Sequence, residues 1–188
     1  MLATIDINYA TYSIMSETYK EEYAFTLEYM KNPPETKDYF GSSDISDLEF
    51  IQVKNMQECM HTSDMEGLYS AISAIPDYST EKFLKAKAYE VILTLRYICD
   101  RINEISQIER EMLRSCVSGD DYSALVEQVD FSPFPQYYTQ LRELAGNDIT
   151  KFEAIKHMKY SDCLVELIYR QKQSDFERLV MKQSARKN

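Results

Sequence analysis

One long heptad pattern constrains this chain more than any other feature. Between Thr80 and Val117 no Gly or Pro interrupts the sequence, and apolar residues recur at alternating spacings of four and three. These apolar positions are Leu84, Ala88, Val91, Leu95, Ile98, Ile102 and Ile105. Such spacing buries one stripe of a helix against partner helices. We therefore predict one uninterrupted central helix over about 80–117, roughly 57 Å long at 1.5 Å per residue.

The same helix shows a change of spacing near its end. After Ile105 the apolar positions of the stripe are expected at Ile108, Met112 and Cys116. Two successive spacings of three shift an apolar stripe around a helix. We therefore expect the buried stripe to leave its original face after Ile105, and we expect Gly119 to end the helix.

The rest of the chain also predicts helices, so we expect an all-α fold. The chain has 188 residues, of which 44% are hydrophobic and only four are Gly, a composition that favours helices around a core. We predict an irregular multi-helix bundle around the long helix, most simply as one domain. Its parts are an N-terminal arm with an acidic helical lobe (1–79), the long helix (80–118) and a C-terminal helical lobe with a basic tail (119–188).

Shorter helices are indicated by apolar faces and by capping signatures. One is expected over about 11–31, and Ser63 with Glu66 forms a capping box for another that Pro76 ends. Asp120 or Asp121 starts a short helix, and Gly146 ends one that begins near Gln136. A last helix over about 161–183 has an apolar face and a polar middle. That face consists of Val165, Tyr169, Phe176 and Val180.

Charge is unevenly distributed along the chain. The net charge of −10 comprises −10 in residues 1–80, −4 in residues 81–169 and +4 in residues 170–188. An acidic N-terminal part repels nucleic-acid phosphates, so we expect nucleic acid to bind only through the basic tail, if at all. Four cations of this tail are candidate protein contacts: Arg178, Lys182, Arg186 and Lys187. The alternative is that they are solvated cations at a helix C-terminus.

The N-terminal part is rich in tyrosine. The chain has 15 Tyr and no Trp, and several of these tyrosines lie close to an arm in which apolar and polar residues alternate. The alternation predicts a short extended segment. Tyrosines at helical spacing form either part of the core or a contact surface for another protein. The candidate contact residues here are Ile5, Ile7, Tyr9, Tyr12, Tyr19 and Tyr23.

Motifs for catalysis or cofactor binding are scarce. The four glycines are too widely separated for a phosphate-binding loop. Glu58 and His61 form one E-x-x-H motif, whereas a di-iron helical bundle needs two such motifs and further carboxylates. We therefore expect no catalytic residues, no metal and no cofactor. A cysteine could still meet His61 or His157 in space, so an enzyme with an unrecognised site stays an alternative.

Together these features predict a non-catalytic helical subunit for protein interaction or assembly, such as a component of a virus or phage particle or of another large complex. The partner would be another protein or a second copy of the chain. One alternative is an acidic inhibitor or nucleic-acid mimic that occupies a basic cleft. We expect no membrane span and no secretory signal, and four dispersed cysteines that stay reduced. The expected location is the cytoplasm, or the virion for a viral protein.

Overall fold

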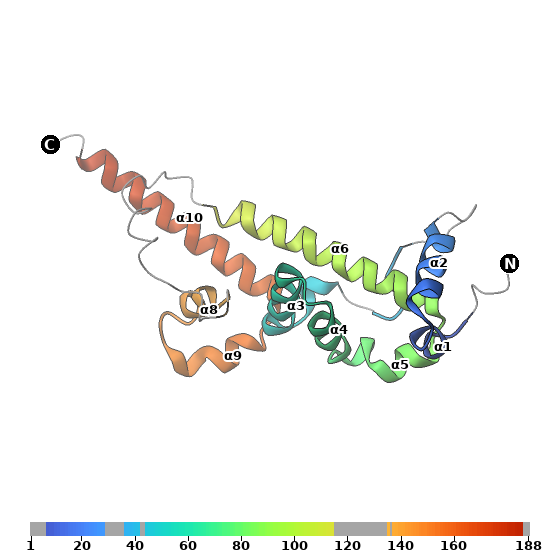
Figure 1. The fold of residues 1–188 in the computed structure, drawn as a ribbon. Coiled ribbons are helices and arrows are strands. Elements are labelled where there is room, and N and C mark those ends of the chain that lie inside the picture. Colours follow the sequence, from blue (N-terminus) through green and yellow to red (C-terminus); the bar gives the residue numbers. More distant parts are fainter. Residues whose placement is uncertain (1–6, 29–35, 42–43, 115–134, 136, 186–188) are drawn as a thin grey trace. The chain divides into compact units, whose positions relative to one another are not determined.

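The fold of the described residues is entirely helical. A computed structural model describes residues 7–28, 36–41, 44–114, 135 and 137–185. These residues contain nine α-helices, three 3₁₀ helices and no strand (Figure 1). The predicted all-α class is therefore confirmed. Among these helices, none combines the length and the apolar character that crossing a bilayer requires.

The central helix is present but begins later than predicted. It is α6, Ala88–Met112, and a separate short helix, α5 (Thr80–Lys85), precedes it. Ala86 between them is extended, with φ −86° and ψ 170°. The expectation of one helix from residue 80 is therefore wrong, although a long central helix is confirmed. The predicted end near Val117 lies outside the described residues.

The break before α6 is stabilised by the N-terminal segment. The backbone N–H of Tyr9 donates to the carbonyl of Ala86 at 2.9 Å, and the N–H of Ala88 donates to the carbonyl of Ile7 at 2.8 Å. Asn8 and Lys87 thus form an isolated antiparallel bridge. Two backbone groups that a continuous helix would have paired internally are paired with the N-terminal segment instead, so these bonds offset part of the hydrogen bonding lost at the break.

The described residues form two compact units, and α6 contributes to both. The first unit comprises residues 1–45 and 59–103, and the second comprises residues 46–58 and 104–188. In the first unit, α1 (Tyr9–Ser13) packs against α5. The other elements of this unit are α2 (Glu17–Glu28), α4 (Met65–Ser73) and the 3₁₀ helix Pro76–Tyr78. The helix expected over 11–31 is thus divided between α1 and α2.

One capping residue differs from the prediction. Helix α4 is capped by Asp64, whose side chain accepts a hydrogen bond from the N–H of Gly67 at 2.9 Å. Ser63 instead adopts a left-handed conformation, with φ 58°. Asp is as good an N-cap as Ser, so the neighbouring carboxylate can take the capping position. The expected capping box at Ser63 is therefore wrong by one residue.

The second unit contains the first part of α3 (Phe50–Thr62), the last part of α6 and all of the C-terminal helices. These are α8 (Tyr138–Leu144), the 3₁₀ helix Ile149–Lys151, α9 (Phe152–Lys156) and α10 (Tyr160–Ala185). Helix α8 packs against both α9 and α10. Gly146, with φ 61°, follows the end of α8 and adopts the left-handed conformation that glycine allows. The short helix expected from residue 120 lies outside the described residues.

The predicted stripe is largely buried on α6. Its members Ala88, Val91, Ile98, Ile102 and Ile105 are buried, and Leu95 is half-buried. Leu84, which lies on α5, is 40% exposed. The heptad pattern therefore identified the buried face correctly from the first residue of α6 onward.

The burial difference along the stripe gives a stability prediction. Truncating Ile98, which is 0% exposed, to Ala should lower the free energy of unfolding by about 2–5 kcal/mol, because a cavity is left in the core. The Leu84→Ala substitution, which removes a similar volume at an exposed site, should cost much less. Urea unfolding followed by circular dichroism measures both. Equal losses in the two variants would contradict the assignment of the core.

Candidate functional site

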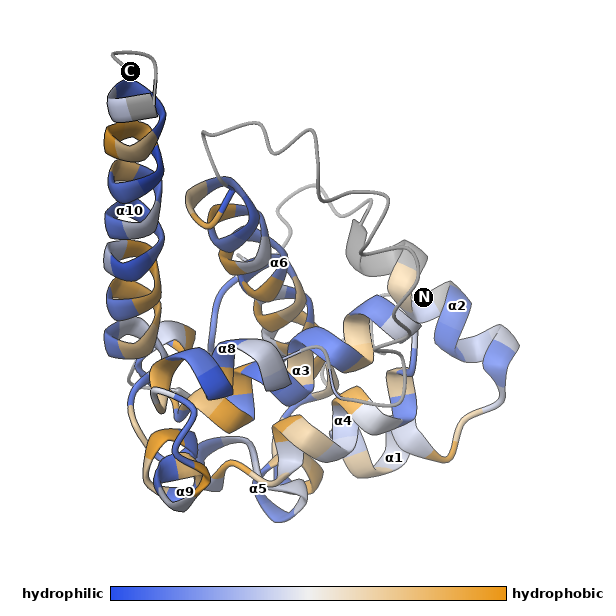
Figure 2. Ribbon diagram, turned by 90° about the vertical axis from the view of Figure 1, so that its left-hand side faces the viewer, coloured by the Kyte–Doolittle hydropathy of each residue, from blue (hydrophilic) through white to orange (hydrophobic). Residues whose placement is uncertain are grey.

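An apolar stripe on α10 lies exposed at the surface. Its four residues follow one face of the helix at spacings of four, seven and four. We call these residues the α10 stripe: Val165 (68% exposed), Tyr169 (65%), Phe176 (66%) and Val180 (45%). Orange, hydrophobic positions accordingly recur along α10 up to its last turns (Figure 2). The sequence grouped these residues correctly, and the structure shows that their face is exposed.

Side chains on the other side of α10 are buried from its first turn as far as Asp175. The apolar ones are Tyr160, Cys163 and Leu167, and Asp175 is 2% exposed. From Phe176 to Ser184, in contrast, every side chain is exposed. Helix α10 is therefore packed against the rest of the structure as far as Asp175 and presents its last turns to solvent.

A largely buried carboxylate, whose side chain is 12% exposed, contacts the beginning of α10. Glu109, on α6, accepts hydrogen bonds from Lys54 Nζ at 2.7 Å to each carboxylate oxygen and from Tyr160 Oη at 2.6 Å. It also accepts one from Gln57 Nε2 at 3.1 Å and another from Gln140 Nε2. We call these five residues the Glu109 cluster. They come from α3, α6, α8 and α10, so one carboxylate connects all four helices.

The electrostatics of the cluster favour the charged pair. Burial raises the pKa of Glu109, but the ammonium of Lys54 and the hydrogen bonds outweigh burial, so the pKa lies below its ordinary value of 4.5. Burial likewise lowers the pKa of Lys54, and the charge of Glu109 opposes this effect. The ammonium also lies 5.7 Å and 5.3 Å from the ring centroids of Phe50 and Tyr160, within the range of cation–π attraction.

The chemistry of the Glu109 cluster is structural. A carboxylate offers about four acceptor sites, and donors from four side chains already occupy the carboxylate of Glu109. A group in this state has little capacity left to accept a proton from a substrate. The cluster therefore joins helices and keeps α10 in a fixed position.

The sequence did not identify the Glu109 cluster, although a signal was present. Glu109 lies four residues after Ile105, so it continues the alternating four-three spacing of the buried stripe. The apolar residues expected to take over, Ile108 and Met112, are 44% and 45% exposed. The predicted shift of the stripe is therefore wrong, because the buried face continues through a charged residue. Cys116 lies outside the described residues.

The predicted contact residues of the N-terminal part lie mostly within the first unit. Ile7, Tyr9 and Tyr12 pack around the buried Tyr23. The ring centroids of Tyr9 and Tyr12 are 5.8 Å apart, and those of Tyr12 and Tyr23 are 5.3 Å apart. Burial, together with the neighbouring Tyr69, raises the pKa of Tyr9 to about 12. This packing favours the core interpretation for these four residues.

The remaining predicted contact residues are exposed or outside the described range. Tyr19 is 64% exposed on α2. Arg178 and Lys182 are exposed near the end of α10. Ile5, Arg186 and Lys187 lie outside the described residues. A contact with a partner stays a prediction for all ten candidates.

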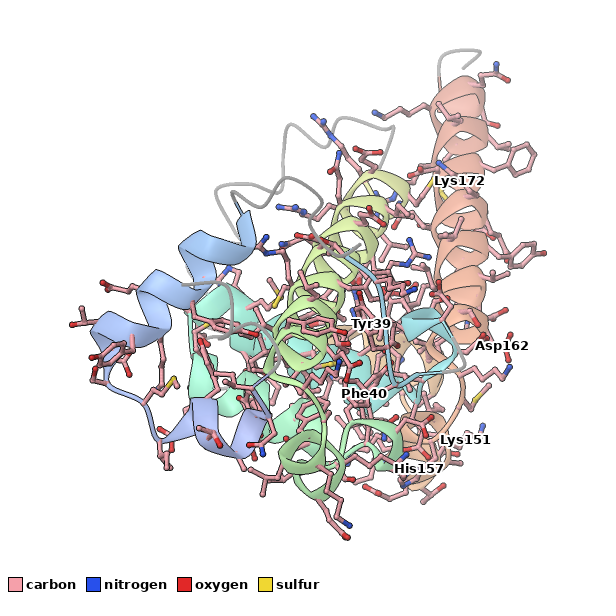
Figure 3. All side chains as sticks on the ribbon, turned by 90° about the vertical axis from the view of Figure 1, so that its right-hand side faces the viewer. Tyr39, Phe40, Lys151, His157, Asp162 and Lys172 are labelled. Atoms are coloured by element: carbon pink, nitrogen blue, oxygen red, sulfur yellow. The ribbon has the colours of Figure 1, made fainter. Side chains whose placement is uncertain are left out.

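Candidate metal ligands do not converge in the described residues. No cluster of three or more His, Cys, Asp or Glu with metal-binding geometry occurs there. His157, which follows α9 (Figure 3), contacts Glu49 through Nδ1 at 2.8 Å. Burial, reinforced by Asp162, raises the pKa of the Cys163 thiol to about 11, so the reactive thiolate is scarce at neutral pH.

Comparison of the chain with protein-family models, curated proteins and solved structures finds no match. The function is therefore inferred from the residues of this chain.

The carboxylate of Glu109 predicts a specific acid sensitivity. Glu109→Gln should lower the free energy of unfolding at neutral pH by about 3–5 kcal/mol, because the charge of Lys54 stays buried without its partner. The folded-state pKa of Glu109 is lowered, so its stabilisation is present above pH 4.5 and lost as the pH falls through the folded-state pKa. The difference between wild type and variant should therefore shrink in acid.

Urea unfolding at several pH values between about 6 and about 3 measures this difference. Glu111→Gln, which alters an exposed carboxylate on the same helix, is the matched control and should change stability by less than about 0.5 kcal/mol. A Glu109→Gln deficit that stays constant down to the lowest pH would contradict the proposed electrostatics.

Proposed function

We propose that this chain is a non-catalytic protein-interaction subunit that binds a protein partner through the α10 stripe. The observation that carries the proposal is the exposure of Val165, Tyr169, Phe176 and Val180 along one face of a single helix. Contiguous apolar patches on a protein surface are typical of interaction sites. An amphipathic helix commonly binds through residues spaced by one or two turns, as these are.

The exposed apolar area of the α10 stripe is large enough to contribute to the free energy of binding. Each of the four side chains leaves on the order of 100 Å² exposed, given the areas of aromatic and aliphatic side chains. Burying roughly 400 Å² of apolar surface at about 25 cal/mol per Å² provides about 10 kcal/mol before the costs of association. Those costs are of similar size, so the stripe supports binding of moderate strength.

Because α10 is anchored, one cost of association is lower, namely the conformational entropy lost when a partner binds. The Glu109 cluster fixes Tyr160 in the first turn. Further along, Arg170 donates hydrogen bonds to Glu166, at 2.6 Å, and to the backbone carbonyl of Glu143 at the end of α8. The helix that presents the stripe is thus formed before a partner arrives. A preformed binding element loses less conformational entropy on association.

A capture experiment tests the proposed function. The immobilised full chain is used to retain proteins from its native source, which mass spectrometry then identifies. A variant with both Tyr169→Ser and Phe176→Ser should bind the partner at least about 30-fold more weakly, because aromatic residues at the centre of an interface contribute most of its energy.

Two further variants serve as comparisons. Met181→Ser removes a residue of α10 that is 69% exposed but lies away from the stripe, and it should retain the partner. Tyr19→Ser tests the exposed tyrosine of the N-terminal part. Circular dichroism verifies that each variant is folded. If the stripe variant retains the same proteins in the same yield as wild type, the proposed function is wrong.

A further inference from the structure

We infer that the N-terminal segment, residues 7–13, is a strap that holds the break between α5 and α6 open, and that its release lets the two helices join into one. This segment contains α1, which lies beside α5 near the beginning of α6 (Figure 1). Two arrangements of the first unit therefore compete. In one the segment is docked and the helix is broken, and in the other the segment is released and the helix is continuous.

The carbonyl of Ile7 takes the place of a helical acceptor. In an α-helix each N–H donates to the carbonyl four residues earlier, so in a continuous helix the N–H of Ala88 would donate to Leu84. In the structure that N–H donates to the carbonyl of Ile7 at 2.8 Å instead. A single hydrogen makes one such short bond, so docking of the segment and continuity of the helix compete for it.

The N–H of Tyr9 takes the place of a helical donor in the same way. In a continuous helix the carbonyl of Ala86 would accept from the N–H of Glu90. It accepts from Tyr9 at 2.9 Å instead, and the N–H of Glu90 donates to the carbonyl of Lys87 at 3.1 Å. Ala86 is extended in this arrangement, so the two sets of bonds cannot form together.

The sequence across the break favours the continuous helix. Residues 84–88 are Leu, Lys, Ala, Lys and Ala, which are all strong helix formers. Leu84 lies one turn before Ala88, so a continuous helix would place it on the same face as the buried stripe. In the broken form Leu84 is 40% exposed. Local preference therefore opposes the break, and tertiary contacts must maintain it.

The packing of Phe83 favours the broken form. This side chain is 0% exposed, and its ring centroid lies 5.2, 6.2 and 6.3 Å from those of Phe40, Tyr69 and Tyr9. Neighbouring residues of a helix point about 100° apart, so a continuous helix would place Leu84, and not Phe83, on the stripe. Each form thus favours burial of one large apolar side chain. The N-terminal segment supplies the Tyr9 ring and both backbone bonds, and it decides between the two forms.

The N-terminal segment is held loosely enough to detach. No residue of α1 is buried, and the side chains of Asn8, Thr11 and Ser13 are exposed. The next residue, Ile14, is 84% exposed. Parts of a protein with few buried side chains open at a lower free energy than its core. The segment can therefore detach while the core of the first unit stays folded.

Nuclear magnetic resonance of the full chain tests the competition. The Cα chemical shift of Ala86 distinguishes extended from helical backbone, and nuclear Overhauser contacts between Ile7 and Ala88 report docking. Tyr9→Pro removes the N–H that donates to Ala86. Proline fits here because Tyr9 is the first residue of α1 and Asn8 before it is extended. In this variant the contacts should be lost, and the Ala86 shift should move towards the helical range.

Two milder variants grade the effect. Tyr9→Ala removes the ring but keeps the N–H, so the Ala86 shift should move in the same direction by a smaller amount. Thr11→Ala alters an exposed side chain of the same segment and is the matched control, which should leave both signals unchanged. If Tyr9→Pro does not fold, the comparison of Tyr9→Ala with Thr11→Ala is decided by the same criterion.

A substitution in the break tests the reverse direction. Lys87→Pro excludes a continuous helix, and Ala86 already has the extended conformation that proline favours in the residue before it. Because the competing form is removed, adding Lys87→Pro to Tyr9→Ala should restore the contacts between Ile7 and Ala88.

Three results would overturn the inference. The first is loss of the contacts from Ile7 without movement of the Ala86 shift towards the helical range. The second is a segment that stays docked in both Tyr9 variants, since Tyr9 would then not be what holds it. The third is a double variant with Lys87→Pro in which docking is not restored, because the continuous helix would then not be the competitor of the segment.

Discussion

The second unit depends on the charge carried by Glu109. Its carboxylate is largely removed from water, so its desolvation must be offset, and Lys54, Tyr160 and two glutamines provide the compensating interactions. The donors lie on α3, α8 and α10, which are separate from α6 in the sequence. The carboxylate of Glu109 is therefore the point at which these helices meet. Apolar packing alone tolerates small shifts between helices. A set of charge-assisted hydrogen bonds at 2.6–2.7 Å requires a more specific arrangement, which fixes the position of α10.

The sequence predicted which face of α6 is buried but did not predict that Glu109 belongs to this face. Heptad spacing places Ile98, Ile102 and Ile105 on one side by geometry alone, and burial follows from their apolar side chains. Glu109 occupies the next position of the same series, yet a criterion based on apolar residues excludes a carboxylate. Its burial depends on Lys54, which is 55 residues away in the chain. Pairings over such separations cannot be deduced from the local pattern.

Periodicity also identified the α10 stripe, but it does not distinguish an apolar face that is buried within the chain from one that is exposed. The spacing of Val165, Tyr169, Phe176 and Val180 indicates one apolar face, and a buried face and a binding face give the same pattern. In the N-terminal part the tyrosine pattern corresponds to packing within the chain, since Tyr12 and Tyr23 pack within the first unit. The difference lies in tertiary contacts. Tyr12 meets the beginning of α6 and its neighbours, whereas the face of α10 lies opposite the residues that anchor it.

The bridge between Asn8 and Lys87 makes one backbone amide unusual. The first amides of a helix normally lack a partner within the helix and exchange their hydrogens readily with water. That of Ala88 is instead bonded to the carbonyl of Ile7. While α5 and α6 are separate helices, its hydrogen is therefore protected by the docked N-terminal segment. Slow exchange at Ala88 thus reports on a segment some 80 residues away in sequence, and detachment of that segment can be followed without any label.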